Sequence, residues 1–444
     1  MPVTDVTGES NRWLAPPLVA ACYRRPQVGS LVRATYAVVL AGGRGSRLKQ
    51  LTDWRCKPAV PFGGKHRIVD FALSNCVNSG VRRIGVATQY RSHSLLQHLQ
   101  RGWNFLDAHL QEFLDVLPAQ QPLQAGWYGG TADAVYQNLD ILRMHAPGYV
   151  LVLAGDHVYK MDYGVMLAEH EATGAEVTIA CLEVPLDDAR AFGVMRVDDR
   201  DRVTGFAEKP DEPEPVPGHP DRALVSMGIY AFGSAALYGF LREDAHDPCS
   251  SRDFGRDVIP ALLARGVHVQ AHRYADSCVN VVHGQPYWRD VGTVDAYWSA
   301  NMDLVRVEPE LNMYDPAWPI RTVEEHLPPA KFVFEAPDAR GQAWDCLVAS
   351  GCVVSGASIH RSLLFTNTVV ERGSHLEDSV ILPEVAIGRG VRLRRAIVDK
   401  FAELPDGFEA GFDAAADAAR FHVTPGGVVL ITPEMLGQRV HEVG

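Results

Sequence analysis

The chain passes from a short apolar run directly into a cluster of glycines, and this junction constrains its fold more than any other stretch. Ala37 to Leu40 are all apolar without alternation, which predicts a short strand buried on both faces. Gly42, Gly43 and Gly45 follow, and regular strands and helices do not tolerate such a group of glycines. Glycines at a turn let the backbone approach a ligand and direct successive N–H groups at it. The junction therefore predicts an anion-binding loop at the end of a buried strand.

Fixed positive charge accompanies this loop. Arg44, Arg47 and Lys57 lie within it or just after it, in a chain whose formal net charge is −12. A polyphosphate is the ligand that fits such a loop. The spacing matches neither the G-x-G-x-x-G dinucleotide fingerprint nor the G-x-x-x-x-G-K-[ST] phosphate loop. A tight β-to-α turn without a ligand stays open as the simpler interpretation.

Length and composition narrow the class of protein. A chain of 444 residues is long enough for two or three domains of about 150 residues each. An excess of 54 acidic over 42 basic residues argues against nucleic acid as the main partner. No apolar run approaches the roughly 20 residues that cross a membrane, and the N-terminus lacks a signal-peptide pattern. The 8 cysteines include no C-x-x-C pair, so we expect a cytoplasmic protein without a disulfide framework or zinc site.

The pattern of apolar residues changes along the chain and predicts its domains. Residues 1–30 have mixed polarity and several prolines, which predicts an N-terminal arm. Strand-like and helix-like stretches alternate over residues 31–305, and this predicts an α/β domain with a Rossmann-like, mostly parallel sheet covered by helices. A proline-rich linker is expected over residues 306–340. Over residues 341–444 apolar positions recur every five or six residues, the sign of a hexapeptide, left-handed parallel β-helix.

Polar residues follow several predicted strands, at the sheet edge where α/β proteins bind ligands. Gln89 follows one strand, and its amide can offer a base both a donor and an acceptor. Asp156 follows the strand from Val150 to Ala154 and is placed to hold a metal, although a helix cap is the commoner role of such a residue. Glu208 and Lys209 end another strand before a proline, where a solvated turn is the simpler interpretation.

Two helices are expected to begin at polar caps. Thr131 can cap a helix that has Asp133 in its first turn. Gly130, just before it, leaves room for a flat base to pack against the backbone. The stretch from Ser251 to Leu263 is expected to be a second N-capped helix with an apolar face.

The motif L-A-G-G-x-G-x-R-L, followed by Lys57-Pro58, resembles the signature of the sugar nucleotidyltransferases. Within that group the runs F-G-G-K-x-R-I-x-D-F and W-Y-x-G-T-A-D-A resemble the ADP-glucose pyrophosphorylases of bacterial glycogen synthesis. The resemblance extends from about Thr35 to about Leu436. It implies that ATP and glucose 1-phosphate react to give ADP-glucose and diphosphate, with Mg²⁺ as cofactor.

The resemblance also implies roles for individual residues. Catalysis is implied for Arg47, Lys57 and Asp156, and Mg²⁺ coordination for Asp156 and Asp290. ATP binding is implied for Gly42, Gly43, Gly45, Gln89, Gly130 and Thr131. Binding of glucose 1-phosphate and ADP-glucose is implied for Tyr128, Gly193, Glu208, Lys209 and Ser226. Effector binding is implied for Arg55, Arg67, Arg394 and Arg395.

Regulation and assembly are expected from the same resemblance. Members of the family respond to glycolytic sugar phosphates as activators and to AMP or phosphate as inhibitors, and homotetramers are usual. The chain departs from the enterobacterial pattern at Trp54, Pro61, Pro433 and Gly437. Fructose 6-phosphate or another glycolytic intermediate is therefore at least as good an expectation for the activator as fructose 1,6-bisphosphate.

A basic clump in the predicted β-helix bears on where an effector would bind. It consists of Arg389, Arg392, Arg394, Arg395 and Lys400. Either a solvated face or an anion site between the two domains explains it.

Two other functions stay open at this point. A pyrophosphorylase for another nucleotide sugar would use UTP or dTTP, although the two runs quoted above favour ADP-glucose. A non-catalytic regulatory subunit would keep the fold for assembly and effector binding, but the charged residues implied in catalysis are all present. A dehydrogenase is set aside because the loop lacks the required glycine spacing.

Overall fold

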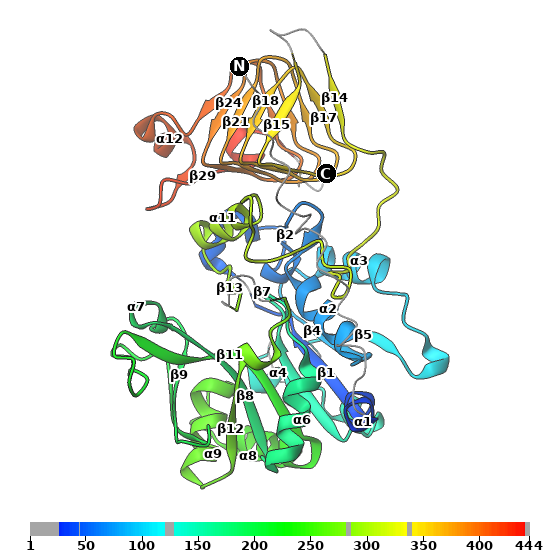
Figure 1. Ribbon diagram of the computed structural model, residues 1–444, viewed down its shortest axis with the longest axis vertical. Coiled ribbons are helices and arrows are strands. Elements are labelled where there is room, and N and C mark those ends of the chain that lie inside the picture. Colours follow the sequence, from blue (N-terminus) through cyan, green and yellow to red (C-terminus); the bar gives the residue numbers. More distant parts are fainter. Residues whose placement is uncertain (1–25, 44, 120–127, 281–285, 335–339, 440–444) are drawn as a thin grey trace, which may run out of the picture.

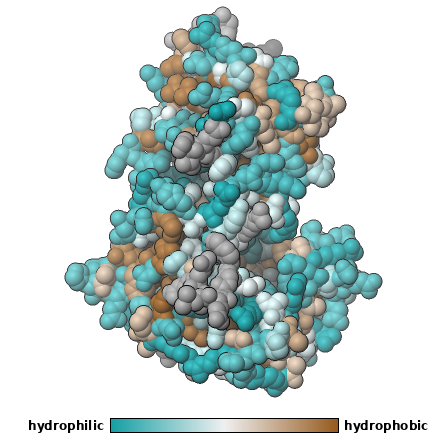
Figure 2. Space-filling view, turned by 180° about the vertical axis from the view of Figure 1, so that it is seen from behind, coloured by the Kyte–Doolittle hydropathy of each residue, from teal (hydrophilic) through white to brown (hydrophobic). Residues whose placement is uncertain are grey.

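The computed structural model describes residues 26–43, 45–119, 128–280, 286–334 and 340–439, which form two lobes joined by an extended segment (Figure 1). The larger lobe holds a sheet covered by helices, and the smaller lobe is a coil of short strands. The opposite view shows a largely hydrophilic face with scattered apolar areas (Figure 2). Among the described residues no helix is long and apolar enough to cross a membrane.

A nine-stranded sheet forms the centre of the larger lobe. Its parallel part runs in the order β6, β1, β4, β5, with bounds β1 (Thr35–Leu40), β4 (Arg83–Thr88), β5 (Phe113–Pro118) and β6 (Tyr149–Ala154). A mostly antiparallel extension is attached to β6 through β11 and comprises β8 (Val177–Pro185), β9 (Gly193–Val197), β10 (Val203–Glu208), β11 (Arg222–Gly233) and β12 (Val269–Arg273). Within it, β12 pairs with β8 in parallel. The predicted Rossmann-like α/β sheet is confirmed, and the extension adds to its parallel part.

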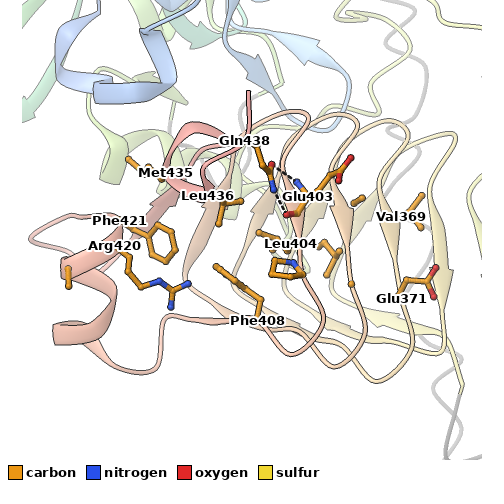
Figure 3. Close-up of a pocket in the computed structure, with 15 residues that line it drawn as sticks. Val369, Glu371, Glu403, Leu404, Phe408, Arg420, Phe421, Met435, Leu436 and Gln438 are labelled. Carbon is orange, nitrogen blue, oxygen red and sulfur yellow. Dashed lines mark hydrogen bonds between the residues drawn. The ribbon is translucent and has the colours of Figure 1, made fainter. Parts of the chain in front are cut away.

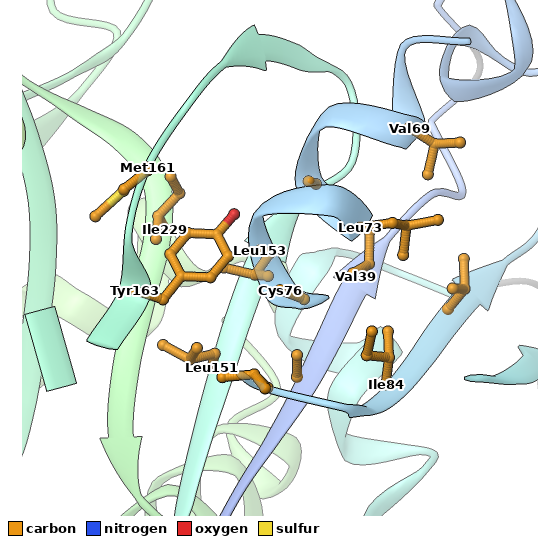
Figure 4. Close-up of a cluster of buried hydrophobic side chains, with 14 of the residues drawn as sticks. Val39, Val69, Leu73, Cys76, Ile84, Leu151, Leu153, Met161, Tyr163 and Ile229 are labelled. Atoms are coloured by element: carbon orange, nitrogen blue, oxygen red, sulfur yellow. The ribbon is translucent and has the colours of Figure 1, made fainter. Parts of the chain in front are cut away.

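The strand predicted before the glycine loop is β1, and both of its faces are buried. Tyr36 and Val38 belong to one apolar cluster, whereas Ala37 and Val39 belong to another. This explains why the strand shows no polar alternation. Figure 4 shows the second cluster, in which helix α2 (Val69–Ser79) lies against the sheet through Val69, Leu73 and Cys76. Helix α2 stops at Gly80, which has the left-handed φ of 87°.

The other helices of the larger lobe lie around the sheet, except for α11, which lies between the sheet and the smaller lobe (Figure 1). Their bounds are α1 (Pro26–Ala34), α3 (His93–Gly102), α4 (Thr131–Tyr136), α5 (Leu139–Met144), α6 (Tyr163–Thr173), α7 (Leu186–Ala189), α8 (Ser234–His246), α9 (Ile259–Ala264), α10 (Tyr274–Ser277) and α11 (Val294–Asp303). Helix α1 packs against α6, so residues 26–30 of the expected N-terminal arm belong to the folded lobe. Residues 1–25 of that arm lie outside the described part of the chain.

The two helices expected from polar caps begin differently. Gly130 is at the N-cap of α4, and no side chain caps this helix. After Ser251 the helical stretch begins only at Phe254, with a π-turn over Phe254–Val258 that continues into α9. Its cap is Asp253, whose carboxylate accepts from two main-chain N–H groups, whereas the Ser251 hydroxyl donates to Asp257. The helix is therefore N-capped, as predicted, but its cap is Asp253, and it begins later than the predicted start at Ser251.

A short antiparallel ribbon of two strands carries the predicted acids. It consists of β7 (His157–Tyr159) and β13 (Trp288–Asp290), with His157 opposite Asp290. Asp156 directly precedes β7. The register of this ribbon therefore brings Asp156 and Asp290 together from distant parts of the sequence.

The smaller lobe is a parallel β-helix made of three stacked sheets, as the left-handed β-helix prediction requires. The first sheet contains β14 (Lys331–Val333), β17 (Val353–Ser355), β20 (Val369–Val370), β23 (Ala386–Ile387) and β26 (Glu403–Leu404). The second contains β15 (Gln342–Trp344), β18 (Ser358–His360), β21 (His375–Glu377), β24 (Arg392–Arg394) and β27 (Glu409–Ala410). The third contains β16 (Leu347–Val348), β19 (Leu363–Leu364), β22 (Val380–Ile381), β25 (Ala396–Val398), β29 (Val429–Ile431) and its antiparallel neighbour β28 (His422–Val423).

The apolar period of this region corresponds to the core of the β-helix. Val354, Ile359, Leu364, Val370, Leu376, Leu382, Ile387, Leu393 and Val398 are all buried, and Val348 is half-buried. Helix α12 (Ala414–Arg420) lies beside the last coils. Because β14 begins at Lys331, the β-helix includes the last residues of the stretch expected to be a linker.

The two lobes meet through shared apolar packing and a buried ion pair. Tyr297 of α11 and Ile397 of the β-helix belong to one apolar cluster. Nearby, Arg55 Nη2 donates to both carboxylate oxygens of Asp399, at 2.9 and 2.8 Å. Both side chains are almost fully buried, so each charge depends on the other for its solvation.

Removing Asp399 would leave the Arg55 guanidinium buried without its counter-charge. We expect Asp399→Ala to reduce the free energy of unfolding by about 3–5 kcal/mol, measured by denaturant unfolding and by the thermal midpoint. Glu409→Ala breaks the exposed Arg392–Glu409 pair in the same lobe and should cost less than about 1 kcal/mol. Equal losses in the two variants would contradict the role assigned to the buried pair.

Candidate active site

An open cleft of about 460 Å³ lies at the carboxyl ends of β1, β4 and β6. It has Leu40, Ala87 and Ala154 at its base. Most of the predicted substrate and catalytic residues line it, namely Gly42, Gly43, Arg47, Gln89, Tyr128, Gly130, Thr131, Asp156, Gly193, Glu208, Lys209, Ser226 and Asp290. Gly45 and Lys57 are not part of the lining, but Lys57 touches residues that are.

The three glycines of the loop serve different purposes. A Cβ on Gly43 would meet no atom within 4 Å, so the backbone here is open to a ligand. A Cβ on Gly42 would lie 3.1 Å from the Cβ of Gln89. Gly45 has a φ of 66°, and a Cβ there would lie 2.8 Å from the Cβ of Lys57, so this glycine lets the lysine chain pass beneath the loop. Arg44 lies outside the described residues.

Lys57 is the central charge of the site. Its buried Nζ lies 2.9 Å from Asp156 Oδ2 and 2.6 Å from Asp290 Oδ1. Arg47 Nη2 approaches Asp290 Oδ2 at 3.5 Å from the solvent side. Burial alone would lower the pKa of Lys57, but the two carboxylates outweigh it and raise that pKa, so the ammonium stays charged.

The positive charges around Lys57 also affect the carboxyl groups of the site. Burial alone would raise the pKa of Asp156, but the positive charges of Lys57 and His157 outweigh it and hold that pKa well below its usual range. Asp156, His157 and Asp290 each offer a ligand atom, and these atoms lie within 4.8 Å of one another. His157 was missed by the sequence analysis as a neighbour of both acids, although it directly follows Asp156. The three side chains could hold a divalent cation.

The segment around Gly130 is shaped by the protein itself. A Cβ on Gly130 would lie 2.3 Å from the carbonyl oxygen of Arg252. The Thr131 hydroxyl donates to Asp253 at 3.0 Å and accepts from the N–H of Phe254. The close approach of residues 251–254 is thus one reason for the glycine, which the sequence analysis had explained only by a stacked base.

Charged and polar side chains from the antiparallel extension form the other end of the cleft. Lys209 has a positive φ of 48°, and its Nζ lies 2.7 Å from Glu208 Oε1. A Cβ on Gly193 would lie 2.4 Å from Phe206 Cζ and 2.9 Å from Glu208 Oε2, so this glycine makes room for the phenylalanine ring and for the carboxylate. Ser226 Oγ accepts from the N–H of Gly228. The sequence analysis missed several further lining residues, namely Phe192, Met227, Tyr230, Asp253 and Gly255.

Comparison with known proteins identifies the family. The nucleotidyl transferase model matches residues 36–307, and the GlmU-like C-terminal hexapeptide model matches residues 328–431. A glucose-1-phosphate adenylyltransferase of Nitrosomonas europaea is 61% identical over 417 residues, 94% of this chain and 96% of the relative. The chain belongs to the glucose-1-phosphate adenylyltransferase family. Relatives with the same name in Nitrosospira multiformis (62% identity, 93% of this chain and 97% of the relative) and Methylobacillus flagellatus (59%, 94% and 97%) agree.

The effector residues implied by this family do not all gather in one place. Arg67 Nη1 donates to the carbonyl and hydroxyl oxygens of Ser94, both at 2.8 Å. Burial lowers the pKa of Arg67 to about 10, and Arg55 contributes to the shift. Lys400 lies in the same electrostatic environment, where burial and then the charge of Arg55 lower its pKa to about 8. Arg55, Arg67 and Lys400 therefore form one basic group between the lobes.

Arg394 and Arg395, from the same clump, lie in different surroundings. Arg394 Nε pairs with Glu377 at 3.2 Å on the outer face of the β-helix. Arg395 donates to the carbonyl of Gly426 and lies over the ring of Trp298 at 4.4 Å. Successive residues of a coil face different sides of the β-helix, so the two arginines are separated although they are adjacent in the sequence. Their role in effector binding stays a prediction.

A second hollow, of about 960 Å³, lies on the β-helix beside α12 (Figure 3). Polar and apolar surface contribute about equally to its walls, with Leu404, Phe408 and Phe421 beside Glu371 and Arg420. At its edge the Gln438 side chain exchanges hydrogen bonds with the main chain of Glu403. It contains none of the residues implied in catalysis, so the reaction of this family is assigned to the cleft of the larger lobe.

Two glycine variants separate ligand contact from internal packing. Gly43→Ala should leave the thermal midpoint unchanged, because its Cβ meets no protein atom, but should weaken ATP binding about 10-fold by blocking the approach to the loop. Gly130→Ala should lower the thermal midpoint, because its Cβ collides with the Arg252 backbone. Both quantities can be measured by calorimetry. Normal ATP affinity in Gly43→Ala would contradict a nucleotide at the loop.

Proposed function

We infer that the protein transfers the adenylyl group of ATP to glucose 1-phosphate and releases ADP-glucose and diphosphate. The observation that carries this inference is the Lys57–Asp156–Asp290 cluster at the glycine loop, in a chain about 60% identical to named glucose-1-phosphate adenylyltransferases. ATP binding is proposed for the loop glycines, Gln89, Gly130 and Thr131. The sugar phosphate is proposed for the opposite end, near Tyr128, Gly193, Glu208, Lys209 and Ser226.

Mg²⁺ is the proposed cofactor, held by Asp156 and Asp290. The position of Lys57 tests the fit, since its ammonium already contacts both carboxylates and thereby shows that they face one cationic centre. Mg²⁺ commonly takes one or two protein carboxylates and completes its shell with phosphate oxygens and water. When bound it would neutralise charge on the triphosphate.

The chemistry needs positioning and positive charge more than it needs a protein nucleophile. A phosphate oxygen of glucose 1-phosphate, already ionised at neutral pH, attacks the α-phosphorus of ATP and diphosphate leaves. Two such anions repel by about 4 kcal/mol at 4 Å and an effective dielectric constant of 20. Arg47 and Lys57 lie on the nucleotide side to offset this repulsion, and Lys209 can hold the phosphate of the sugar.

Regulation is proposed for the basic group between the lobes. Arg55 Nε and Nη1 are buried and have no hydrogen-bond partner in the part of the chain that the structure describes. With Arg67 and Lys400 they form a site that suits a phosphate group, so a sugar phosphate activator and AMP or phosphate as inhibitor are proposed to act there. The homotetramer and the cytoplasmic location expected from the family stay predictions.

The test is diphosphate release by the purified protein with glucose 1-phosphate and Mg²⁺, using ATP or UTP. We expect turnover with ATP, increased by fructose 6-phosphate and reduced by AMP. Preference for UTP would indicate a pyrophosphorylase for another nucleotide sugar. No turnover under any condition would indicate a regulatory subunit.

Asp156→Asn should remove catalysis while leaving the shape of the site. We expect kcat to fall by at least about 100-fold with a modest change in KM, because the amide cannot hold the cation that stabilises the transition state. Steady-state kinetics at saturating Mg²⁺ measure this. A normal kcat would exclude Asp156 from the mechanism.

Lys209→Ala should act on one substrate only. Loss of its charge should raise KM for glucose 1-phosphate about 10-fold or more and leave KM for ATP within about twofold, because Lys209 lies at the sugar end of the cleft. Arg196→Ala removes another exposed cation of the same extension, paired with Glu214, and should change neither constant. An unchanged KM for glucose 1-phosphate in Lys209→Ala would refute the assignment.

A further inference from the structure

Asn75 of α2 is completely buried, and its amide bonds to two separate parts of the chain. Nδ2 donates to the carbonyl oxygen of Tyr159 at 3.1 Å. Oδ1 accepts from the N–H of Met161 at 3.2 Å and from the indole Nε1–H of Trp318 at 2.9 Å. Two donors on one side and a carbonyl on the other fix the orientation of the amide. Asn75 therefore connects the end of β7 with the segment that leads to the β-helix.

The end of β7 matters because this strand belongs to the ribbon that carries the acids. Asp156 precedes β7, and Tyr159 and His157 are opposite Trp288 and Asp290 in the register. A shift of β7 relative to β13 would change the separation of the two carboxylates. Groups that act on a cation or a substrate must be held to within about 0.5 Å, so the support behind the ribbon is part of the site.

Apolar packing and hydrogen bonds from two side chains of α2 hold the segment that follows Asp156. Met161 and Tyr163 pack in the same apolar cluster as Leu73 and Cys76 of α2 (Figure 4). Met161 and Tyr159 are fully buried, so water cannot replace the amide at their main-chain groups. The hydrogen bonds of Asn75 hold the end of β7 itself, whereas the other side-chain bond from α2, from Tyr163 N–H to Ser79 Oγ at 2.8 Å, lies further along the chain from the acids.

The linker has a second bond to α2 that does not involve the ribbon. Ser74 Oγ accepts from the N–H of Arg321 at 2.8 Å. Among the hydrogen bonds that the structure describes, Ser74 has none to β7, whereas Asn75 bonds both the linker and β7. The two neighbours on one helix therefore separate attachment of the linker from support of the ribbon.

We propose that Asn75 is a positioning residue that sets the separation of Asp156 and Asp290 and makes it depend on the linker through Trp318. The proposal rests on the proposed function in one respect, namely that these acids bind a divalent cation. Because β14 follows this linker, the position of the β-helix has a direct mechanical connection to the metal-binding acids.

The test compares three variants of the full chain by Mn²⁺ binding, followed by electron paramagnetic resonance, together with kcat, KM and the thermal midpoint. Asn75→Asp keeps both acceptor bonds but places an oxygen against the Tyr159 carbonyl, and should weaken Mn²⁺ binding about 10-fold. Trp318→Phe removes only the indole N–H that the linker donates to Asn75, and should weaken Mn²⁺ binding about threefold. Ser74→Ala is the matched control, with Mn²⁺ affinity and kcat at the wild-type level even though its thermal midpoint falls.

The outcomes are distinct even if Asn75→Asp does not fold. Weaker Mn²⁺ binding in Trp318→Phe than in Ser74→Ala, at similar thermal midpoints, supports the proposal. Wild-type Mn²⁺ affinity in Trp318→Phe, or an equal loss in Ser74→Ala, overturns it. Mn²⁺ binding without any diphosphate release by the wild-type protein would refute the proposed reaction while leaving the positioning result valid.

Discussion

The arrangement of the active site depends on the two ion pairs that the ammonium group of Lys57 makes. The ammonium joins Asp156, from the end of a central strand, to Asp290, from the ribbon that leads into α11. Two carboxylates this close would repel each other without it. Gly45 is part of the same arrangement, because a side chain at that position would collide with the Lys57 chain. The glycine loop thus has two purposes, to expose its backbone to an anion and to let the lysine reach the acids.

Much of the fold could be predicted because its signals are local. The non-alternating run at β1 indicated burial on both faces, and Gly80 marked the end of α2. The apolar period of the C-terminal region identified the β-helix, since each coil repeats the same inward positions. The antiparallel extension through β11 was not visible, because the pairing of strands depends on contacts between distant residues that single-strand patterns do not encode.

The residues proposed for the site were predicted from sequence motifs. The contacts that hold these residues in place lie outside the motifs and could not be predicted, for physical reasons. Gly130 is restricted by the backbone of Arg252, and Asn75 bonds the end of β7 and Trp318, which lie beside it only in space. Such pairs are far apart in the sequence and have no spacing rule. Arg394 and Arg395 show the opposite case, since they are neighbours in the sequence but lie in different surroundings.

The contact between the lobes contains a stabilising buried ion pair but also an excess of positive charge. One nitrogen of Arg55 is satisfied by Asp399, but Nε and Nη1 are buried without partners among the described residues, and Arg67 and Lys400 add further positive charge. Burial of several cations around one paired carboxylate is unfavourable, and it lowers the pKa of Lys400 to about 8. An anion bound there would relieve this cost and strengthen the contact. Since the same contact holds the β-helix and its linker, an effector that binds between the lobes and the Asn75 connection to the acids would act on one mechanical unit.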